Sequence, residues 1–306
     1  MQIDRSSLAP TSVPATSNAV LKVPLEVPLE VQSIVVGYPA QQDACLHDVS
    51  FCARQGEVTA VIGPNGAGKT TLVRAVTGLV PLRSGSVLLF GEELGGYSRT
   101  RLAQRVAVVA QSSRVALGFS VREVVAMGRA PYQGSMLVGT KQDQDIVQDA
   151  LAETELLGLA DRPVASLSGG EQKRVAIARA FAQQPDLLIL DEAAAHLDIR
   201  YQVALRNLVL DRVKHQGLTC LSIMHDLTDV VQWADHVVIL RQGRLYAKGP
   251  VHEVMRSNVL EGAFGVELVE GVVPGEKSRF FIARRDLTGP SGARQASRTP
   301  AGHQGP

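Results

Sequence analysis

One short motif constrains the fold of this chain more than any other feature. Residues 63–70 read GPNGAGKT and match the pattern G-x-x-x-x-G-K-[ST]. The motif follows an apolar run at 58–62, which predicts a strand, and precedes a stretch at 70–79, which predicts a helix. Such glycines let backbone N–H groups curve around a phosphate, and the helix start adds a favourable dipole. This order predicts a phosphate-binding loop, and a chance glycine-rich turn is the less favoured alternative.

The residue types in this loop suit a nucleoside triphosphate with magnesium. Lys69 is placed to reach the β- and γ-phosphates, and the Thr70 hydroxyl is a ligand type that Mg²⁺ accepts. The residues expected to surround the phosphates are Gly63, Pro64, Asn65, Gly66, Ala67, Gly68, Lys69, Thr70 and Thr71.

A second motif, LLILDE at residues 187–192, places two carboxylates at the end of an apolar strand. Asp191 at the strand tip is expected to bind Mg²⁺ through water, and Glu192 to polarise an attacking water as a general base. Adjacent carboxylates repel each other, and a bound cation relieves that repulsion. Taken alone, an exposed acidic turn explains the pair equally well; together with the loop ending at Lys69, the catalytic interpretation is favoured.

Short apolar runs alternate with amphipathic stretches through the body of the chain, which predicts an α/β fold. Apart from 58–62, the expected strands are residues 106–110, 187–190, 219–224 and 236–240. The expected helices are residues 70–79, 171–184 and 199–215. Several strands are apolar at consecutive positions, as in a parallel sheet covered on both faces. Residues 120–160 are helical in pattern, so we expect an inserted all-helical subdomain at about 115–165.

Composition excludes several classes of protein and marks the ends of the chain. Lys plus Arg (31) nearly balances Asp plus Glu (30), which argues against bulk nucleic-acid binding. No apolar run is long enough to cross a bilayer, and three cysteines without metal-ligand spacing suit a reducing compartment. We expect a disordered leader at 1–29, a folded domain at 30–270, and a C-terminal extension at 271–306 that is disordered from about 287.

Residues 167–172, LSGGEQ, begin a predicted helix and limit the protein families to which the chain can belong. Ser168 and Glu171 have the form of a capping box, and a plain helix cap is the simpler interpretation. Gly169 and Gly170 would lower the stability of the first helical turn, so a helix cap alone does not explain them. They do expose backbone N–H groups that could make a second phosphate contact. Here the sequence resembles the ATP-binding subunits of ABC transporters, whose signature is LSGGQ. The resemblance extends over about residues 31–268.

The resemblance implies a P-loop NTPase core with a parallel-rich sheet and a small antiparallel β subdomain. It implies that Tyr38 stacks on adenine, that Gln111 touches Mg²⁺ together with Thr70 and Asp191, and that His225 contacts the γ-phosphate. Asp198 matches an aspartate that communicates across a dimer. Taken singly, Tyr38, Gln111 and His225 also fit an edge residue, a solvated amide and a core histidine. Their joint occurrence in the family's order favours the functional interpretation.

The family's mechanism implies that this chain is an ATPase working as a homodimer. The turn formed by Ser168, Gly169, Gly170 and Glu171 of one subunit closes on ATP held by the loop of the other. The expected partners are integral-membrane permease subunits and, indirectly, an extracytoplasmic substrate-binding protein, with no nucleic acid. The expected location is the cytoplasmic face of the inner membrane, as a peripheral subunit.

Two positions depart from the family, which usually has Pro-Thr after the catalytic glutamate where this chain has Ala193 and Ala194. We expect the loss of proline's fixed φ to loosen this turn and ATP hydrolysis to persist.

Residues 119–134 and the FGVEL stretch at 264–268 look like the subunits that power uptake of iron-siderophore complexes, haem and cobalamin. Iron-chelate transport ranks first among these expected functions, with haem and cobalamin next. Phe119, Val121, Val124, Val125 and Met127 are candidates for a groove that receives a permease helix, with ordinary core packing as the favoured alternative for most of them. The alternative functions are the detached ATPase of an exporter and a soluble ABC protein that does not transport. A regulatory module without turnover is disfavoured because the expected catalytic residues are all present.

Overall fold

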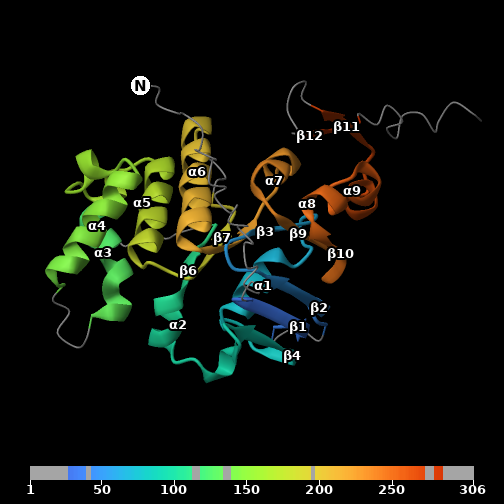
Figure 1. Cartoon of the computed structure of the whole chain (residues 1–306), viewed down its shortest axis with the longest axis horizontal. Coiled ribbons are helices and arrows are strands. Elements are labelled where there is room, and N and C mark those ends of the chain that lie inside the picture. Colours follow the sequence, from blue (N-terminus) through green and yellow to red (C-terminus); the bar gives the residue numbers. More distant parts are fainter. Residues whose placement is uncertain are drawn as a thin grey trace, which may run out of the picture.

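The computed structural model describes residues 27–38, 43–111, 118–133, 139–193, 197–272 and 279–284 (Figure 1). Nearly all of the expected leader and the tail expected from about residue 287 lie outside these residues. Among the described helices, none combines the length and apolar character needed to cross a membrane.

A six-stranded sheet in the order β10-β9-β3-β8-β7-β6 forms the centre of the molecule. Five of its strands run parallel, and β10 pairs antiparallel with β9 at one edge. The strands are β3 (Val58–Ile62), β6 (Val106–Val109), β7 (Leu187–Asp191), β8 (Thr219–Ile223), β9 (His236–Arg241) and β10 (Arg244–Pro250). Every residue of β3, β7 and β8 is buried, which explains their uninterrupted apolar sequences. The predicted parallel-rich α/β core is confirmed.

The central strands bury both faces against different layers. Leu188 and Leu190 pack in a cluster with α5 (Gly169–Ala182) and α6 (Ile199–Gln216). Leu187 and Ile189 pack in a second cluster with α1 and the antiparallel sheet. Side chains alternate across a strand, so one apolar run serves both clusters. Figure 1 shows the consequence: α5 and α6 lie on one side of the sheet, and α1 with β1, β2 and β4 on the other.

A separate antiparallel sheet in the order β2-β1-β4-β5 confirms the small β subdomain. Its strands are β1 (Leu29–Val36), β2 (Leu46–Ala53), β4 (Leu82–Leu89) and β5 (Glu92–Glu93). The neighbouring helices are α1 (Lys69–Val76), the 3₁₀ turn η1 (Leu94–Gly96) and α2 (Arg99–Arg105). Helix α1 ends earlier than the sequence predicts, because Gly78 adopts a left-handed φ of 69° just beyond its C-cap.

The predicted helical subdomain consists of α3, α4 and the signature helix α5, which pack on one another. Its elements are α3 (Val121–Ala126), η2 (Met127–Tyr132), α4 (Lys141–Glu153), η3 (Leu157–Leu159) and η4 (Val164–Ser166). Capping boxes start both α3 and α4. Buried Arg129 lies against Asp143, with Nε 2.8 Å from Oδ1. Val121, Val124 and Val125 are buried, so they are core residues, whereas Phe119 is 41% and Met127 38% exposed.

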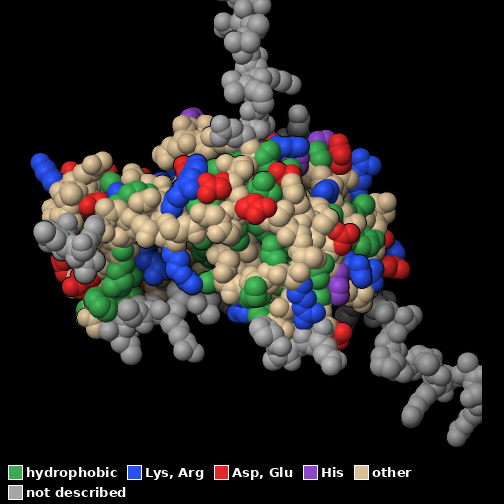
Figure 2. All heavy atoms as spheres, turned by 90° about the horizontal axis from the view of Figure 1, so that it is seen from below, with side chains coloured by type: hydrophobic (Ala, Val, Ile, Leu, Met, Phe, Trp, Pro, Cys, Tyr) green, Lys and Arg blue, Asp and Glu red, His purple; other side chains and the backbone are tan. Residues whose placement is uncertain are grey.

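The C-terminal part of the described chain adds helices and a hairpin to the core. Its elements are α7 (Leu227–Trp233), α8 (Val251–Val254), α9 (Ser257–Phe264), β11 (Leu268–Val272) and β12 (Arg279–Ala283). Strands β11 and β12 pair antiparallel, and β12 packs against α7. The domain boundary expected at residue 270 therefore falls inside β11. On the face shown in Figure 2, basic and acidic side chains are interspersed, in keeping with a net charge of +1.

Candidate functional site

The phosphate loop joins the carboxyl end of β3 to α1 and needs glycine where the chain turns most tightly. Gly63 has a φ of 149°, and a Cβ there would lie 2.1 Å from the carbonyl oxygen of Leu240. Gly68 has a φ of 100°, and a Cβ there would lie 2.5 Å from the Leu46 side chain. Both positions therefore exclude any side chain, for steric as well as conformational reasons.

Lys69 is buried inside the loop that carries it. Its Nζ donates to the carbonyl oxygens of Gly63 at 2.7 Å and Pro64 at 3.1 Å. Burial lowers the pKa of this amine, and the carboxylates of Glu192 and Asp191 oppose that shift. Next to Lys69, Thr70 is exposed at the start of α1. The loop thus presents an ammonium and a hydroxyl close together.

Tyr38 lies beside the same helix. Its hydroxyl accepts a hydrogen bond from Arg74 at 2.9 Å and lies 3.4 Å from the Thr71 Oγ1. The structure therefore places Tyr38 next to the phosphate loop, and its stacking on adenine stays a prediction.

Asp191 ends β7 as a buried carboxylate that lacks a full set of partners. The residue is 4% exposed, and its Oδ1 has no hydrogen-bond partner among the described residues. Burial raises the pKa of this carboxyl, and the charge of Glu192 raises it further. An orphaned buried carboxylate oxygen beside a second carboxylate fits a small, hard cation such as Mg²⁺, which is held by few protein ligands. No larger cage of His, Cys, Asp and Glu side chains occurs in the described part of the chain.

Glu192 is held by two residues that are distant in sequence. Its Oε2 accepts a hydrogen bond from the Gln111 Nε2 at 2.5 Å, and its Oε1 contacts the His225 Nε2. Glu192 itself has a φ of +52°, a conformation that costs a non-glycine residue about 1–3 kcal/mol. Gln111, Glu192 and His225 follow the adjacent strands β6, β7 and β8, so the sheet order brings together three side chains that the sequence predicted one by one.

The signature turn has the predicted capping geometry and an open front. The Glu171 carboxylate accepts hydrogen bonds from the Ser168 backbone N–H and hydroxyl, both at 2.8 Å, which lower its pKa. Ser168 and Gly169 are exposed, and a Cβ on Gly169 would meet nothing within 4 Å. Between described residues, no hydrogen bond or ion pair links this turn to residues 63–71. Asp198 caps α6 by accepting from the Arg200 N–H at 3.0 Å.

The structure describes only the first residue of the segment after Glu192 in which the sequence departs from the family. Ala193 is buried at 2% exposure, and Ala194 to His196 lie outside the described residues.

One residue of the site was missed by the sequence analysis. Lys173, on α5, donates from Nζ to the carbonyl oxygens of Ala110 at 2.9 Å and Gln111 at 3.1 Å. The sequence marks Lys173 only by its position directly after LSGGEQ. No local pattern predicts its contact with Ala110, which lies 63 residues earlier in the chain.

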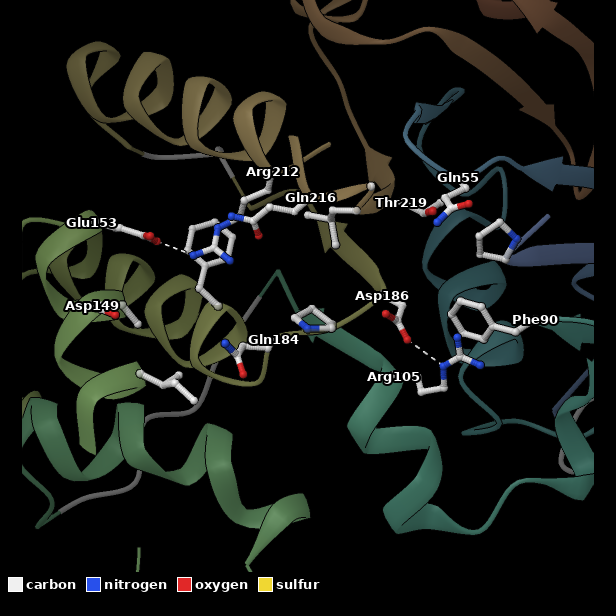
Figure 3. A pocket seen from close by; sticks show the side chains of 17 residues that line it. Gln55, Phe90, Arg105, Asp149, Glu153, Gln184, Asp186, Arg212, Gln216 and Thr219 are labelled. Atoms are coloured by element: carbon white, nitrogen blue, oxygen red, sulfur yellow. Dashed lines mark hydrogen bonds and ion pairs between the residues drawn. The ribbon is translucent and has the colours of Figure 1, made fainter. Parts of the chain in front are cut away.

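A separate pocket of about 430 Å³ lies at the opposite, amino-terminal ends of β7 and β8 (Figure 3). Figure 3 shows Arg212 directed at Glu153 on one side and Arg105 directed at Asp186 on the other. Arg105 also stacks 3.4 Å above the Phe90 ring. Four of the five charged side chains that line this pocket are thus paired with each other, and the Arg212–Glu153 pair joins α6 to α4.

Comparison with known proteins agrees with this geometry. The family model described as ABC transporter matches residues 46–195. The hemin import ATP-binding protein HmuV of Streptomyces coelicolor is 42% identical over 221 residues, which cover 72% of this chain and 77% of the relative. The cobalamin import ATP-binding protein BtuD of Halobacterium salinarum is 37% identical over 229 residues, 75% of this chain and 57% of the relative.

A solved ATP-binding subunit of an ABC transporter superposes with a TM-score of 0.68 at 30% identity, covering 77% of this chain and 95% of that one. Family match, relatives and fold all lead to one conclusion: the chain belongs to the ABC transporter family, as a subunit that binds and hydrolyses ATP.

Proposed function

We propose that the site described above hydrolyses ATP with Mg²⁺ as cofactor. Residues 63–71 bind the phosphates, Lys69 reaches the β- and γ-phosphates, and Thr70, Asp191 and Gln111 hold Mg²⁺. When bound, Mg²⁺ neutralises charge on the phosphate oxygens. The observation that carries the proposal is the meeting of Gln111, Glu192 and His225 beside the buried, under-satisfied Asp191.

In this proposal Glu192 accepts the proton of the attacking water. Gln111 fixes one carboxylate oxygen of Glu192 and His225 lies at the other, so the base is oriented before the water arrives. His225 then contacts the γ-phosphate, and Tyr38 stacks on adenine. These roles are supported by the side chains present and by their positions around the loop.

We propose further that two copies form a head-to-tail dimer. The open signature turn of one copy, with Ser168 and exposed backbone N–H groups at a helix start, suits the γ-phosphate held by the other copy. Asp198 lies near this interface in the proposal. Phe119 and Met127, exposed on the helical subdomain, are proposed contacts for a permease subunit.

The proposed task is to energise uptake of a metal chelate, with hemin ranked first and iron-siderophore and cobalamin next. Support comes from the names of the relatives, which are hemin import for HmuV and cobalamin import for BtuD. A third relative, the probable siderophore transport system ATP-binding protein YusV of Bacillus subtilis, is 33% identical over 239 residues. These residues cover 78% of this chain and 86% of that protein. The proposed partners are membrane permeases and, through them, an extracytoplasmic binding protein. The proposed location is the cytoplasmic face of the inner membrane.

Affinity purification from gently solubilised host membranes, followed by mass spectrometry, tests the partners. A permease with its binding protein supports the importer, and ribosomal partners contradict it. Deletion of the gene should abolish growth on hemin as the only iron source, with growth on ferrous salts as control. Loss of growth on ferric siderophore alone would replace hemin by that substrate.

A further inference from the structure

Lys173 bridges two parts of the molecule that the proposed function treats separately. It lies on α5, the helix whose first turn carries Ser168, Gly169 and Gly170. Its ammonium donates to the carbonyl oxygens of Ala110 and Gln111 at 2.9 and 3.1 Å, just beyond the end of β6. One helix therefore holds both the partner-facing turn and the backbone of the Gln111 segment.

Gln111, whose backbone accepts from Lys173, in turn contacts the proposed catalytic carboxylate of Glu192. The Gln111 side chain donates to the Glu192 Oε2 at 2.5 Å, so the backbone that Lys173 holds sets the position of this donor. The other lysine of the site does not supply this link, because the Lys69 ammonium donates within its own loop, to Gly63 and Pro64.

The positive charge of Lys173 also interacts favourably with the two carboxylates of the site. Burial lowers the pKa of its amine, while the charges of Asp191 and then Glu192 raise it. The attraction of a half-buried ammonium to two adjacent carboxylates offsets part of the repulsion between them.

We propose that Lys173 is a positioning residue for ATP hydrolysis: it fixes the backbone at Gln111 so that the Gln111 amide holds Glu192, and it ties this arrangement to the signature helix. The inference rests on the roles proposed above for Gln111 and Glu192. A shift of α5, as when its first turn engages a partner's nucleotide, is passed through Lys173 to the catalytic carboxylate of the same subunit.

Three variants of the full-length chain separate positioning from simple packing. Lys173→Met keeps the stem and loses the donors, and we expect kcat to fall about tenfold while the Kd for a fluorescent ATP analogue stays within about twofold. Lys173→Arg, which keeps charge and donors, should retain at least about half of the wild-type kcat, and Lys173→Gln should lie between the two. Equal losses in all three variants, or a loss in affinity without a loss in kcat, would overturn the proposal.

A double-mutant cycle tests whether Lys173 acts through Gln111. In the Gln111→Ala background, Lys173→Met should lower kcat by no more than about twofold, because the donor that it positions is gone. Additive effects of the two substitutions would show that Lys173 acts by another route, and the proposal would fail.

Three controls distinguish failure of this inference from failure of the proposed function. Lys214→Met, on the exposed face of α6, should behave as wild type, and melting monitored by the fluorescence of Trp233 should show that every variant is folded. Glu192→Gln is measured alongside. If it retains turnover, the proposed roles of Glu192 and Gln111 are wrong; if it abolishes turnover while Lys173→Met is fully active, only the present inference is wrong.

Discussion

Single side chains decide the chemistry of this site, and each carries a structural cost. Glu192 occupies a left-handed backbone conformation, and Asp191 keeps a buried oxygen without a partner. Neither feature stabilises the fold. Both are expected where a carboxylate must face a reacting water or a cation, because strain and unsatisfied polar atoms concentrate at functional sites.

Glu192→Gln is the direct test at this scale. The amide has nearly the shape of the carboxylate but cannot accept a proton, so we expect kcat to fall about 10²- to 10⁴-fold with ATP affinity retained. Steady-state hydrolysis and equilibrium binding of ATP measure the two quantities. Glu253→Gln, on the exposed α8, is the matched control. Normal hydrolysis by Glu192→Gln would remove this residue from the mechanism.

The three cysteines provide a second residue-scale prediction. Cys220 is fully buried in β8, and burial raises the pKa of its thiol to about 12. Only the thiolate reacts with alkylating reagents, so at pH 8 Cys220 should remain unlabelled in the folded protein and react after unfolding in urea. Peptide mass spectrometry of samples treated with iodoacetamide reads the result. Labelling of Cys220 in the native protein at the rate of Cys45 or Cys52 would contradict the buried placement.

At the scale of elements, ion pairs hold the helices of the inserted subdomain together and join them to the core. Arg129 contacts Asp143 on α4 and also donates to the carbonyl oxygen of Ala182 at the end of α5. Arg212 on α6 contacts Glu153 on α4 across the pocket of Figure 3. The subdomain is thus positioned by charged contacts at its margins in addition to its apolar interior.

Arg129→Met should destabilise the protein strongly. The substitution removes the cation from the buried Asp143 carboxylate, which keeps only its hydrogen bonds from Thr140, and breaking a buried pair in this way costs about 3–5 kcal/mol. Arg101→Met breaks an exposed pair with Glu92 and should cost no more than about 1 kcal/mol. Urea unfolding followed by circular dichroism compares the two free energies. Equal, small losses would mean that the Arg129 pair contributes no more than a surface contact.

For the whole molecule, the main consequence of the proposed mechanism is that one copy alone holds an incomplete site. The phosphate loop and the proposed catalytic residues lie together, whereas the signature turn is open to solvent and, among the described residues, makes no hydrogen bond to the loop of its own chain. A second copy supplies that turn in the proposed dimer. Nucleotide then controls assembly, because an N-terminal dipole facing a γ-phosphate is favourable only while the phosphate is present.

Light scattering tests this assembly. Glu192→Gln with ATP should double in mass, and adding Gly169→Asp should return it to the mass of a monomer, since a carboxylate at the turn repels the γ-phosphate. Gly169 has open space around it and an acidic residue suits a first helical turn, so the variant should fold. An ATP-dependent dimer that forms equally well with Gly169→Asp would show that the signature turn does not face the nucleotide.

The sequence by itself determined the features that depend on neighbouring residues. The glycine-rich loop, the apolar strands, the capping box of α5 and the identity of each motif residue follow from local conformational preferences and periodicity. Only tertiary structure decided which of these residues meet. Gln111 and Glu192 are 81 residues apart, and they touch because strand order β6-β7-β8 is fixed by packing on both faces of the sheet. The contact of Lys173 with Ala110 has the same origin: the apolar packing of α5 against the sheet, which no local pattern encodes.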